Sequence, residues 1–295
     1  MMKFKEYAYK YLKFGKSEWK NSTFDKNQGI VANRLNFFFD YDLTDIKPSV
    51  IKDWLSAIDD VGSKSKKHYI SSLNSILTLA LQDEMIDKNP LIHLRSVKSR
   101  TPDIEPFTKD EVRSILKEAK FYNKNLVMFL YLGFYTGMRT GEILALKFKD
   151  IDMKNKTISV KSSRSRFGES TPKTAGSIRI IPILDELLPV IARSFYFFDS
   201  ASLDYVLRTQ YNKPYRDTWI FQGYWKQILK KLGLKYRRPY VMRHTFATNM
   251  LLDNHVTPLE LASLLGHSSP KMIYDVYVRY VNKNLKSFDR SIKVY

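Results

Sequence analysis

The spacing of apolar residues predicts helices in the first hundred residues. Aromatic side chains recur every three or four positions between Phe4 and Phe14, which places them on one face of an α-helix. Similar spacing occurs in residues 22–38, 50–58 and 63–85. The last stretch opens with a basic turn containing Lys64, Lys66 and Lys67 and continues as an apolar face. The pattern predicts a helical block with one strongly basic helix end, and an anion near that end would stabilise it.

Capping signals delimit helices in the C-terminal third of the chain. Thr257 and Glu260 form a capping-box pair, with a proline at the first helical position. Gly266 marks the end of that helix, because glycine takes the left-handed C-cap conformation without a steric penalty. One apolar run precedes this helix, and a Ser-Pro pair opens another after it. Three short helices are therefore expected between residues 240 and 277.

The one convincing β region lies at residues 156–183. Side chains alternate in Thr157–Val160, and β-branched residues recur in Ile178–Ile183, which is typical of strands. The polar stretch between them predicts a hairpin-like excursion that carries Lys173. A lysine on such a turn is usually only solvated, so this residue alone indicates no site.

Helices are expected on both sides of the β region. Thr108 and Glu111 form a second capping box, and an apolar helix is predicted over residues 126–134. Residues 185–235 also read as helical, and their aromatic clusters read as core. The fold class is therefore mainly α with a small β-sheet.

A polar, basic, proline-bearing stretch without periodicity, RSVKSRTPDIEP, divides the chain. Such composition is typical of a linker between domains. We expect a helical domain over residues 1–99, a linker at 100–105 and a mixed domain over 106–295. A chain of 295 residues is long enough for two domains that each bury a core.

Charge is the strongest compositional feature. The net charge is +19, from 49 lysine and arginine residues against 30 acidic ones. This excess favours a polyanionic partner, most plausibly nucleic acid, with salt-dependent binding; the alternative reading is solubility alone. No apolar run approaches the roughly 20 residues that span a bilayer, and no cysteine is present. Secretion has no support in the sequence, so the cytoplasm is the expected compartment.

The chemistry-bearing residues cluster around helix ends. Arg139 lies in a glycine-flanked turn directly before a predicted helix, where it could reach an anion near the helix N-terminus. Arg243 opens another helix, and His267 follows Gly266. The five histidines show no metal-ligand spacing, so no metal or cofactor is expected. Arginine, histidine and tyrosine together suit chemistry on a phosphodiester, whose charge guanidinium groups neutralise bidentately.

These motifs resemble the tyrosine recombinases, the family of the phage integrases. The match consists of TGMRTGEILAL, a lysine in the β region, RHTFAT, LLGH and a tyrosine ten residues after that histidine. Five motifs in this order over residues 108–280 are far more specific than any one of them. The N-terminal block is similar to the core-binding domain of the family.

The resemblance implies a role for each matching residue. Arg139 and Arg243 correspond to the arginines that clamp the scissile phosphate, and Glu142 to the acidic residue that supports the site. Lys173 corresponds to the general acid, His267 to a hydrogen-bond donor to the phosphate, and Tyr277 to the nucleophile. Residues expected to contact DNA are Lys64, Lys66, Lys67, Arg164, Arg166, Arg237 and Arg238.

The chain departs from the family pattern at Tyr240. The family usually has histidine three positions before the second arginine, which is Arg243 here. A phenol can donate a hydrogen bond to a phosphate, but it cannot carry positive charge or accept a proton near neutral pH. Tyr240 is therefore a candidate site residue whose role differs from that of the usual histidine.

Two tyrosines compete for the role of nucleophile. Tyr274 and Tyr277 lie about one helical turn apart and can face the same side. Tyr277 follows His267 by ten positions, which matches the interval of the family, whereas Tyr274 follows it by seven. We expect Tyr277 to attack.

By resemblance, the two domains form a C-shaped clamp around duplex DNA. The expected enzyme is a tyrosine-type recombinase that cuts and rejoins specific DNA sites through a 3′-phosphotyrosyl intermediate, without metal or ATP. Four protomers would assemble on two sites, with residues 281–295 docking on a neighbour. The alternatives are type IB topoisomerase-like relaxation of DNA and a catalytically silent DNA-binding protein.

Overall fold

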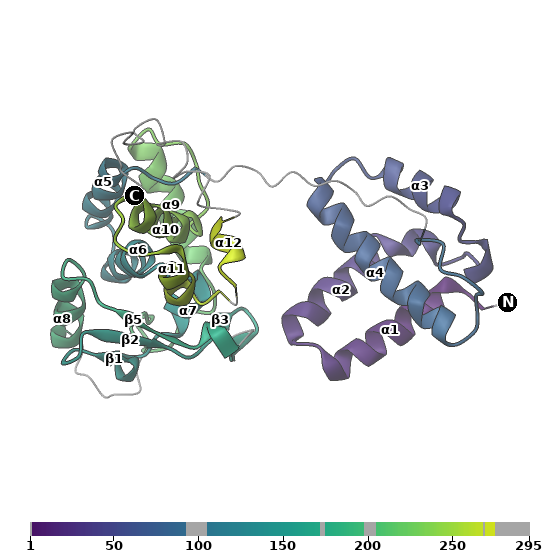
Figure 1. Cartoon of the computed structure of the whole chain (residues 1–295), viewed down its shortest axis with the longest axis horizontal. Coiled ribbons are helices and arrows are strands. Elements are labelled where there is room, and N and C mark those ends of the chain that lie inside the picture. The colour runs from purple at the N-terminus through teal and green to yellow at the C-terminus, as the bar shows by residue number, and fades with distance from the viewer. Residues whose placement is uncertain (1, 93–104, 172–174, 198–204, 268, 275–295) are drawn as a thin grey trace, which may run out of the picture. The chain divides into compact units, whose positions relative to one another are not determined.

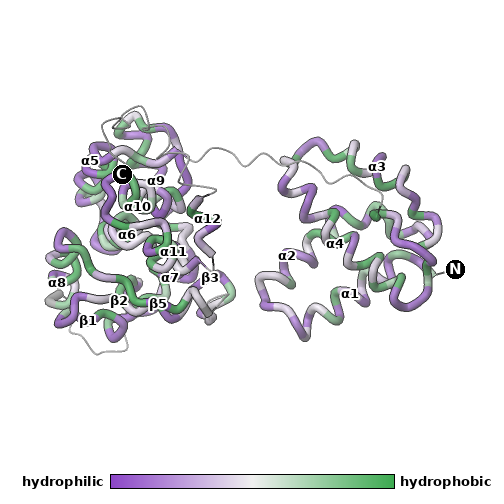
Figure 2. The backbone as a smooth tube through the Cα atoms, viewed as in Figure 1, coloured by the Kyte–Doolittle hydropathy of each residue, from purple (hydrophilic) through white to green (hydrophobic). Residues whose placement is uncertain are grey.

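The chain forms two compact units, Met1–Pro102 and Asp103–Tyr295. The computed structural model describes residues 2–92, 105–171, 175–197, 205–267 and 269–274, coloured along the chain in Figure 1. Within these ranges, no helix is long and apolar enough to cross a membrane. Figure 2 shows hydrophobic and hydrophilic positions alternating along the backbone of both units, as amphipathic elements require.

The first unit is helical, as the apolar spacing predicts. Its helices are α1 (Phe4–Glu18), α2 (Asn21–Asn33), α3 (Pro48–Ala57) and α4 (Ser63–Gln82), with 3₁₀ turns at Leu35–Phe38 and Leu43–Asp45. Helix α1 packs against both α2 and α4. The core is rich in aromatic side chains, and the fully buried Phe38 ring contacts the rings of Phe4 and Trp54. The segment expected as one run over 22–38 is broken at Arg34, where a 3₁₀ turn replaces the α-helix.

The second unit combines helices with a small antiparallel sheet (Figure 1). Strands β1 (Ile151–Asp152), β2 (Thr157–Val160) and β5 (Arg179–Pro182) pair in the order β1-β2-β5. Strands β3 (Ser163–Ser165) and β4 (Gly168–Ser170) form a separate hairpin. Before the sheet lie helices α5 (Lys109–Ala119), α6 (Lys124–Thr136) and α7 (Thr140–Ala145) and a 3₁₀ turn, Phe148–Asp150. After it come a 3₁₀ turn at Ala175–Ser177 and helices α8 (Leu188–Phe197), α9 (Trp219–Lys231), α10 (Val241–Leu252), α11 (Pro258–Leu265) and α12 (Lys271–Ile273).

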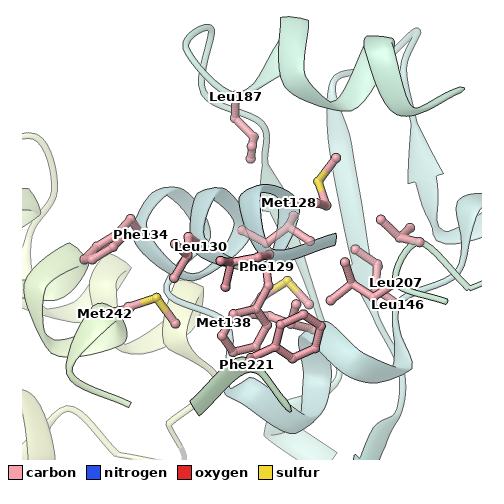
Figure 3. Packing of buried hydrophobic residues seen from close by; sticks show 14 of the residues in the cluster. Met128, Phe129, Leu130, Phe134, Met138, Leu146, Leu187, Leu207, Phe221 and Met242 are labelled. Carbon is pink, nitrogen blue, oxygen red and sulfur yellow. The ribbon is translucent and has the colours of Figure 1, made fainter. Parts of the chain in front are cut away.

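Helix α6 is the centre of the core of the second unit (Figure 3). Its apolar side chains point to several sides, and Met128, Phe129 and Phe134 are buried together with Met242 of α10. A helix that is apolar nearly all round must be covered on most sides. The burial of α6 therefore fixes the position of its C-terminal turn, where the motif that contains Arg139 begins.

The continuous helical interpretation of residues 185–235 is wrong for 205–218. This stretch forms isolated bridges, among them Arg208 with Pro214, and Asn212 has a positive φ of 59°. Proline lacks an N–H donor, and asparagine tolerates the left-handed region, so both favour a turn over a helix. The aromatic cluster from 219 to 225 is core only in part, because Trp225 is buried and Trp219 is 79% exposed.

Candidate active site

The C-terminal turn of α11 binds three arginines. Gly266 ends the helix in the left-handed conformation, with φ 65°, which leaves the last carbonyl groups of the helix without partners inside the helix. Three consecutive carbonyls accept from guanidinium groups of three different elements, and the negative end of the helix dipole favours this positive charge. The pairs are Arg179 Nε to Leu264 O (2.6 Å), Arg243 Nη2 to Leu265 O (2.7 Å) and Arg139 Nη2 to Gly266 O (3.3 Å).

Arg243 is the most deeply buried of the candidate residues, at 1% exposed. Its Nη1 donates to the Gly137 carbonyl at 2.9 Å, and its Nη2 lies 2.8 Å from His267 Nε2. Burial, followed by the charge of Arg139, lowers the pKa of Arg243 to about 10. The guanidinium therefore remains charged at neutral pH.

Glycines hold Arg139 and Arg243 in this geometry. Gly137 has φ 62°, and a Cβ there would lie 2.5 Å from the Phe246 ring. A Cβ at Gly141 would lie 2.8 Å from the Arg164 carbonyl oxygen of β3. Because a side chain at either position would collide with fixed groups, the glycine-flanked turn is required by close packing as well as by conformation.

Glu142 lies behind Arg139 and orients it. The Arg139 backbone N–H donates to Glu142 Oε2 at 2.8 Å, and Arg139 Nη1 donates to Oε1 at 2.8 Å. The Glu142 side chain is 2% exposed, whereas that of Arg139 is 33% exposed. Arg139 is thus fixed at its base while its guanidinium still reaches solvent, as a phosphate-binding residue requires.

Arg179 is a member of this network that sequence reasoning missed. Its Nη2 donates to Glu142 Oε2 at 2.8 Å and its Nη1 to Oε1 at 3.1 Å. Burial is the largest single influence on the pKa of Glu142 and raises it, but the hydrogen bonds and charge of Arg179 and the hydrogen bonds from Arg139 together outweigh burial, so the net shift is downward. The strand pattern carried a signal, because period-2 alternation places Arg179 on the same inward face as Ile181 and Ile183.

His267 is neutral and adopts a defined tautomer. A guanidinium only donates, so His267 Nε2 accepts from Arg243 and the ring hydrogen lies on Nδ1. That Nδ1 is buried without a hydrogen-bond partner among the residues described. Burial, followed by the charges of Arg243 and Arg139, lowers the pKa of His267 to about 4.

Two partly buried histidines predict a pH dependence of stability. Burial and the Arg243 charge also lower the pKa of His244 to about 4, from 6.5. Between pH 6.5 and 4 the unfolded chain binds protons at His244 and His267 that the folded chain does not, so the unfolding free energy falls as pH falls through this window. Denaturant unfolding at pH 7.5, 6 and 5 measures the slope. We expect His267→Gln to reduce it, and a wild-type unfolding free energy that is unchanged from pH 7 to 5 would contradict this account.

Tyr240 lies one helical turn before Arg243, at the start of α10. The Arg243 backbone N–H donates to the Tyr240 carbonyl at 3.2 Å. The ring is 42% exposed and packs edge-on against His244, with centroids 5.1 Å apart. The phenol is therefore accessible to a ligand at the start of the helix that carries Arg243.

Two predicted catalytic residues, Lys173 and Tyr277, lie outside the described residues. The described hairpin ends at Ser170 and thus before Lys173, and the competing Tyr274 directly follows α12 and is 55% exposed. Within the described ranges, no group of three or more acidic or histidine side chains could hold a metal ion.

The residues expected to contact DNA differ in their surroundings. Lys64, Lys67, Arg166 and Arg238 are exposed. The Nζ of Lys66 donates to the Leu55 carbonyl at 3.1 Å, and Arg164 Nε donates to the Tyr215 carbonyl at 2.8 Å.

Arg237 lies in a network of ion pairs. Its guanidinium is held by Glu111 at 3.0 Å and Glu105 at 3.3 Å, stacks on Phe107 at 4.3 Å, and is 11% exposed. Two carboxylates already compensate this charge, and the contact between Arg237 and DNA stays a prediction.

Comparisons with known proteins cover most of the chain. A model of the phage integrase family matches residues 105–284, and a model of the phage integrase N-terminal SAM-like domain matches residues 3–58. A XerC-like tyrosine recombinase of Caldanaerobacter subterraneus is 29% identical over 90% of this chain and 75% of its own length. A putative prophage phiRv2 integrase of Mycobacterium tuberculosis is 30% identical over 79% of this chain. The chain spans 63% of the length of that relative and 57% of prophage integrase IntR of Escherichia coli.

Solved structures show the same fold. The Tn1549 transposon integrase, in complex with transposon right end DNA, superposes with a TM-score of 0.82 at 20% identity, covering 97% of this chain and 99% of that one. A lambda integrase fragment bound to a core site gives 0.72 at 20% identity, covering 92% and 97%. The mainly helical fold with small antiparallel sheets is confirmed. From the family match over 105–284, the chain belongs to the phage integrase family, the tyrosine recombinases.

Proposed function

We propose that this protein catalyses site-specific DNA recombination, cutting and rejoining DNA strands through a covalent 3′-phosphotyrosyl intermediate at Tyr277. One observation carries the proposal. Arg139 and Arg243, 104 positions apart in the sequence, both donate to the end of α11 next to His267. This arrangement gathers hydrogen-bond donors and positive charge at one point, as transfer of a phosphodiester requires.

The charges of the site suit a phosphodiester. Three guanidinium groups, those of Arg139, Arg179 and Arg243, are opposed by the single carboxylate of Glu142, and His267 is neutral at pH 7. The cluster therefore has two positive charges in excess. A phosphodiester brings one negative charge, and nucleophilic attack on phosphorus adds negative charge to its non-bridging oxygens.

The proposed step conserves atoms and charge. The Tyr277 hydroxyl loses its proton to solvent as its oxygen bonds to phosphorus. The bond from phosphorus to the 5′ oxygen breaks, the Lys173 ammonium protonates the leaving oxygen, and Lys173 regains a proton from solvent. Arg139 and Arg243 stabilise the non-bridging oxygens, and each such charged donor is typically worth about 3–4 kcal/mol. Attack by a 5′ hydroxyl on the phosphotyrosine reverses the step, and the bond energy is kept throughout.

His267 requires a change of hydrogen-bond partner during this step. In the described state its Nε2 accepts from Arg243. A phosphate that engages Arg243 would release Nε2, and the neutral ring could then place its hydrogen there and donate to the phosphate. Tyr240, on the first turn of the same helix as Arg243, would contribute a further hydroxyl donor where the family usually has histidine.

The proposed partner is double-stranded DNA with specific recombination sites, bound in the cytoplasm. The net charge of +19 supports a polyanionic partner. A lambda integrase of the same fold is a tetramer on a Holliday junction, and we propose a homo-tetramer for this protein by analogy. Strand exchange between two sites, rather than relaxation of any supercoiled DNA, distinguishes this function from a topoisomerase.

The test is to trap the covalent intermediate. Nicked DNA substrates that lose a short fragment after cleavage cannot be religated, so the proposed enzyme accumulates as a protein–DNA adduct that resists denaturation. We expect the adduct to carry the DNA through its 3′ phosphate, and sequencing the trapped DNA identifies the site. Binding to DNA without any adduct would support the catalytically silent alternative.

A further inference from the structure

Arg179 is a buried arginine with every nitrogen engaged. Its side chain is 5% exposed. Its Nε donates to the Leu264 carbonyl at 2.6 Å, its Nη1 to Ser177 O and Glu142 Oε1 at 3.1 Å each, and its Nη2 to Glu142 Oε2 at 2.8 Å. The arginine therefore connects strand β5, helix α7 and the end of helix α11.

Stability alone does not require an arginine at this position. Arg179 faces inward on β5 with Ile181, where an apolar residue is the usual choice. Burying a charged pair costs desolvation energy that the attraction barely repays, and apolar replacements of whole buried pairs are often neutral or stabilising. The presence of the charge at this position is better explained by the residues that it holds in place.

The Glu142 carboxylate is shared between two arginines. Oε1 accepts from both Arg139 and Arg179, and Oε2 accepts from Arg179 and from the Arg139 backbone N–H. Arg179 thus fixes the plane of the carboxylate that orients Arg139. It also ties that carboxylate to α11, whose next two carbonyls hold Arg243 and Arg139.

We propose that Arg179 is a positioning residue for DNA cleavage, which sets Arg139 relative to Arg243 through Glu142 and the C-terminal turn of α11. This inference rests on the proposed function. Arg179 has a second effect, because its charge compensates the Glu142 carboxylate. Without it, Glu142 would pair with Arg139 alone and reduce the positive charge that Arg139 offers to a phosphate.

The test compares cleavage of two DNA substrates by Arg179→Lys. The lysine keeps the charge but loses the planar fork that engages Glu142. On nicked DNA with an ordinary scissile phosphodiester, we expect single-turnover cleavage to fall about 10²-fold, the effect of a misplaced catalytic group, while DNA affinity is unchanged. On DNA with a neutral methylphosphonate at the same position, the cleavage rate of Arg179→Lys should fall less relative to the wild type. The reason is that no phosphate charge remains for Arg139 to neutralise.

Controls separate positioning from damage to the fold. Arg113→Lys changes an arginine that is 75% exposed, and its cleavage rate should equal that of the wild type on both substrates. Cleavage rates are normalised to the amount of adduct finally formed. Arg179→Met provides a second variant, which has no ammonium group. If Arg179→Lys cleaved both substrates at the wild-type rate, or if its cleavage rate fell by the same factor on both, the positioning role would be overturned. The proposed function would not be affected by either result. A wild-type protein that forms no adduct overturns the proposed function and this inference with it.

Discussion

Tyr277→Phe is expected to abolish the covalent protein–DNA adduct while DNA binding persists. The substitution removes one oxygen atom and keeps the ring, so packing changes little, but the attacking atom is gone and no bond to phosphorus can form. The role proposed for Tyr277 rests on its spacing of ten positions from His267. The measurement is a denaturing gel of wild-type and variant protein incubated with nicked DNA, beside a binding assay on the same DNA.

Tyr274→Phe is the matched control, because Tyr274 lies three positions earlier in the sequence. Tyr274 directly follows α12 and its side chain is 55% exposed. We expect this variant to form the adduct at the wild-type rate. If Tyr277→Phe formed the adduct and Tyr274→Phe did not, Tyr274 would be the nucleophile. The role proposed for Tyr277 from its spacing would then be wrong.

Local signals in the sequence predicted the elements that frame the site. The capping boxes at Thr108–Glu111 and Thr257–Glu260 are both formed, and Gly266 ends α11 in the left-handed conformation. These interactions join residues only a few positions apart, so both partners can be recognised in a short stretch of sequence. The predicted helical first unit and the small sheet are also confirmed. The strands were signalled by local alternation, although strand β2 pairs with β5 about 20–25 positions away.

The interactions that local sequence patterns did not reveal involve distant partners. Arg179 contacts Glu142 from 37 positions away and the end of α11 from 85 positions away. Arg237, expected to contact DNA, is 126 positions from Glu111, which holds it. A charge pattern shows that an arginine is present, but only the tertiary fold decides whether a carboxylate or a phosphate will meet it.

The sequence predicted that Arg139 and Arg243 come together, but it did not predict which groups hold them there. The motifs around Arg139 and Arg243 indicated a shared phosphate through resemblance alone. The structure adds a physical reason, since consecutive carbonyls of one helix end hold both side chains, and the negative end of the α11 dipole offsets part of their mutual repulsion.

Arg243→Lys is expected to lower the single-turnover cleavage rate by about 10²–10³-fold, the usual effect of losing one preorganised charged donor. The guanidinium reaches Gly137 O, Leu265 O and His267 Nε2 at once. An ammonium on a shorter, flexible stem cannot reproduce this fork. A carbonyl left unpaired in the buried site costs about 1–3 kcal/mol, so thermal stability should fall as well. Quenched-flow cleavage of nicked DNA and a thermal melt measure the two effects.

DNA affinity should change far less than the rate in Arg243→Lys, because binding is distributed over many phosphate contacts and this residue supplies one of them. A parallel loss of affinity and rate would show that Arg243 acts in binding and not selectively in the transition state. The exposed Arg113→Lys variant again controls for the loss of a guanidinium. If Arg243→Lys cleaved DNA as fast as Arg113→Lys, the convergence on α11 would be structural, and the phosphate would have to bind elsewhere in the protein.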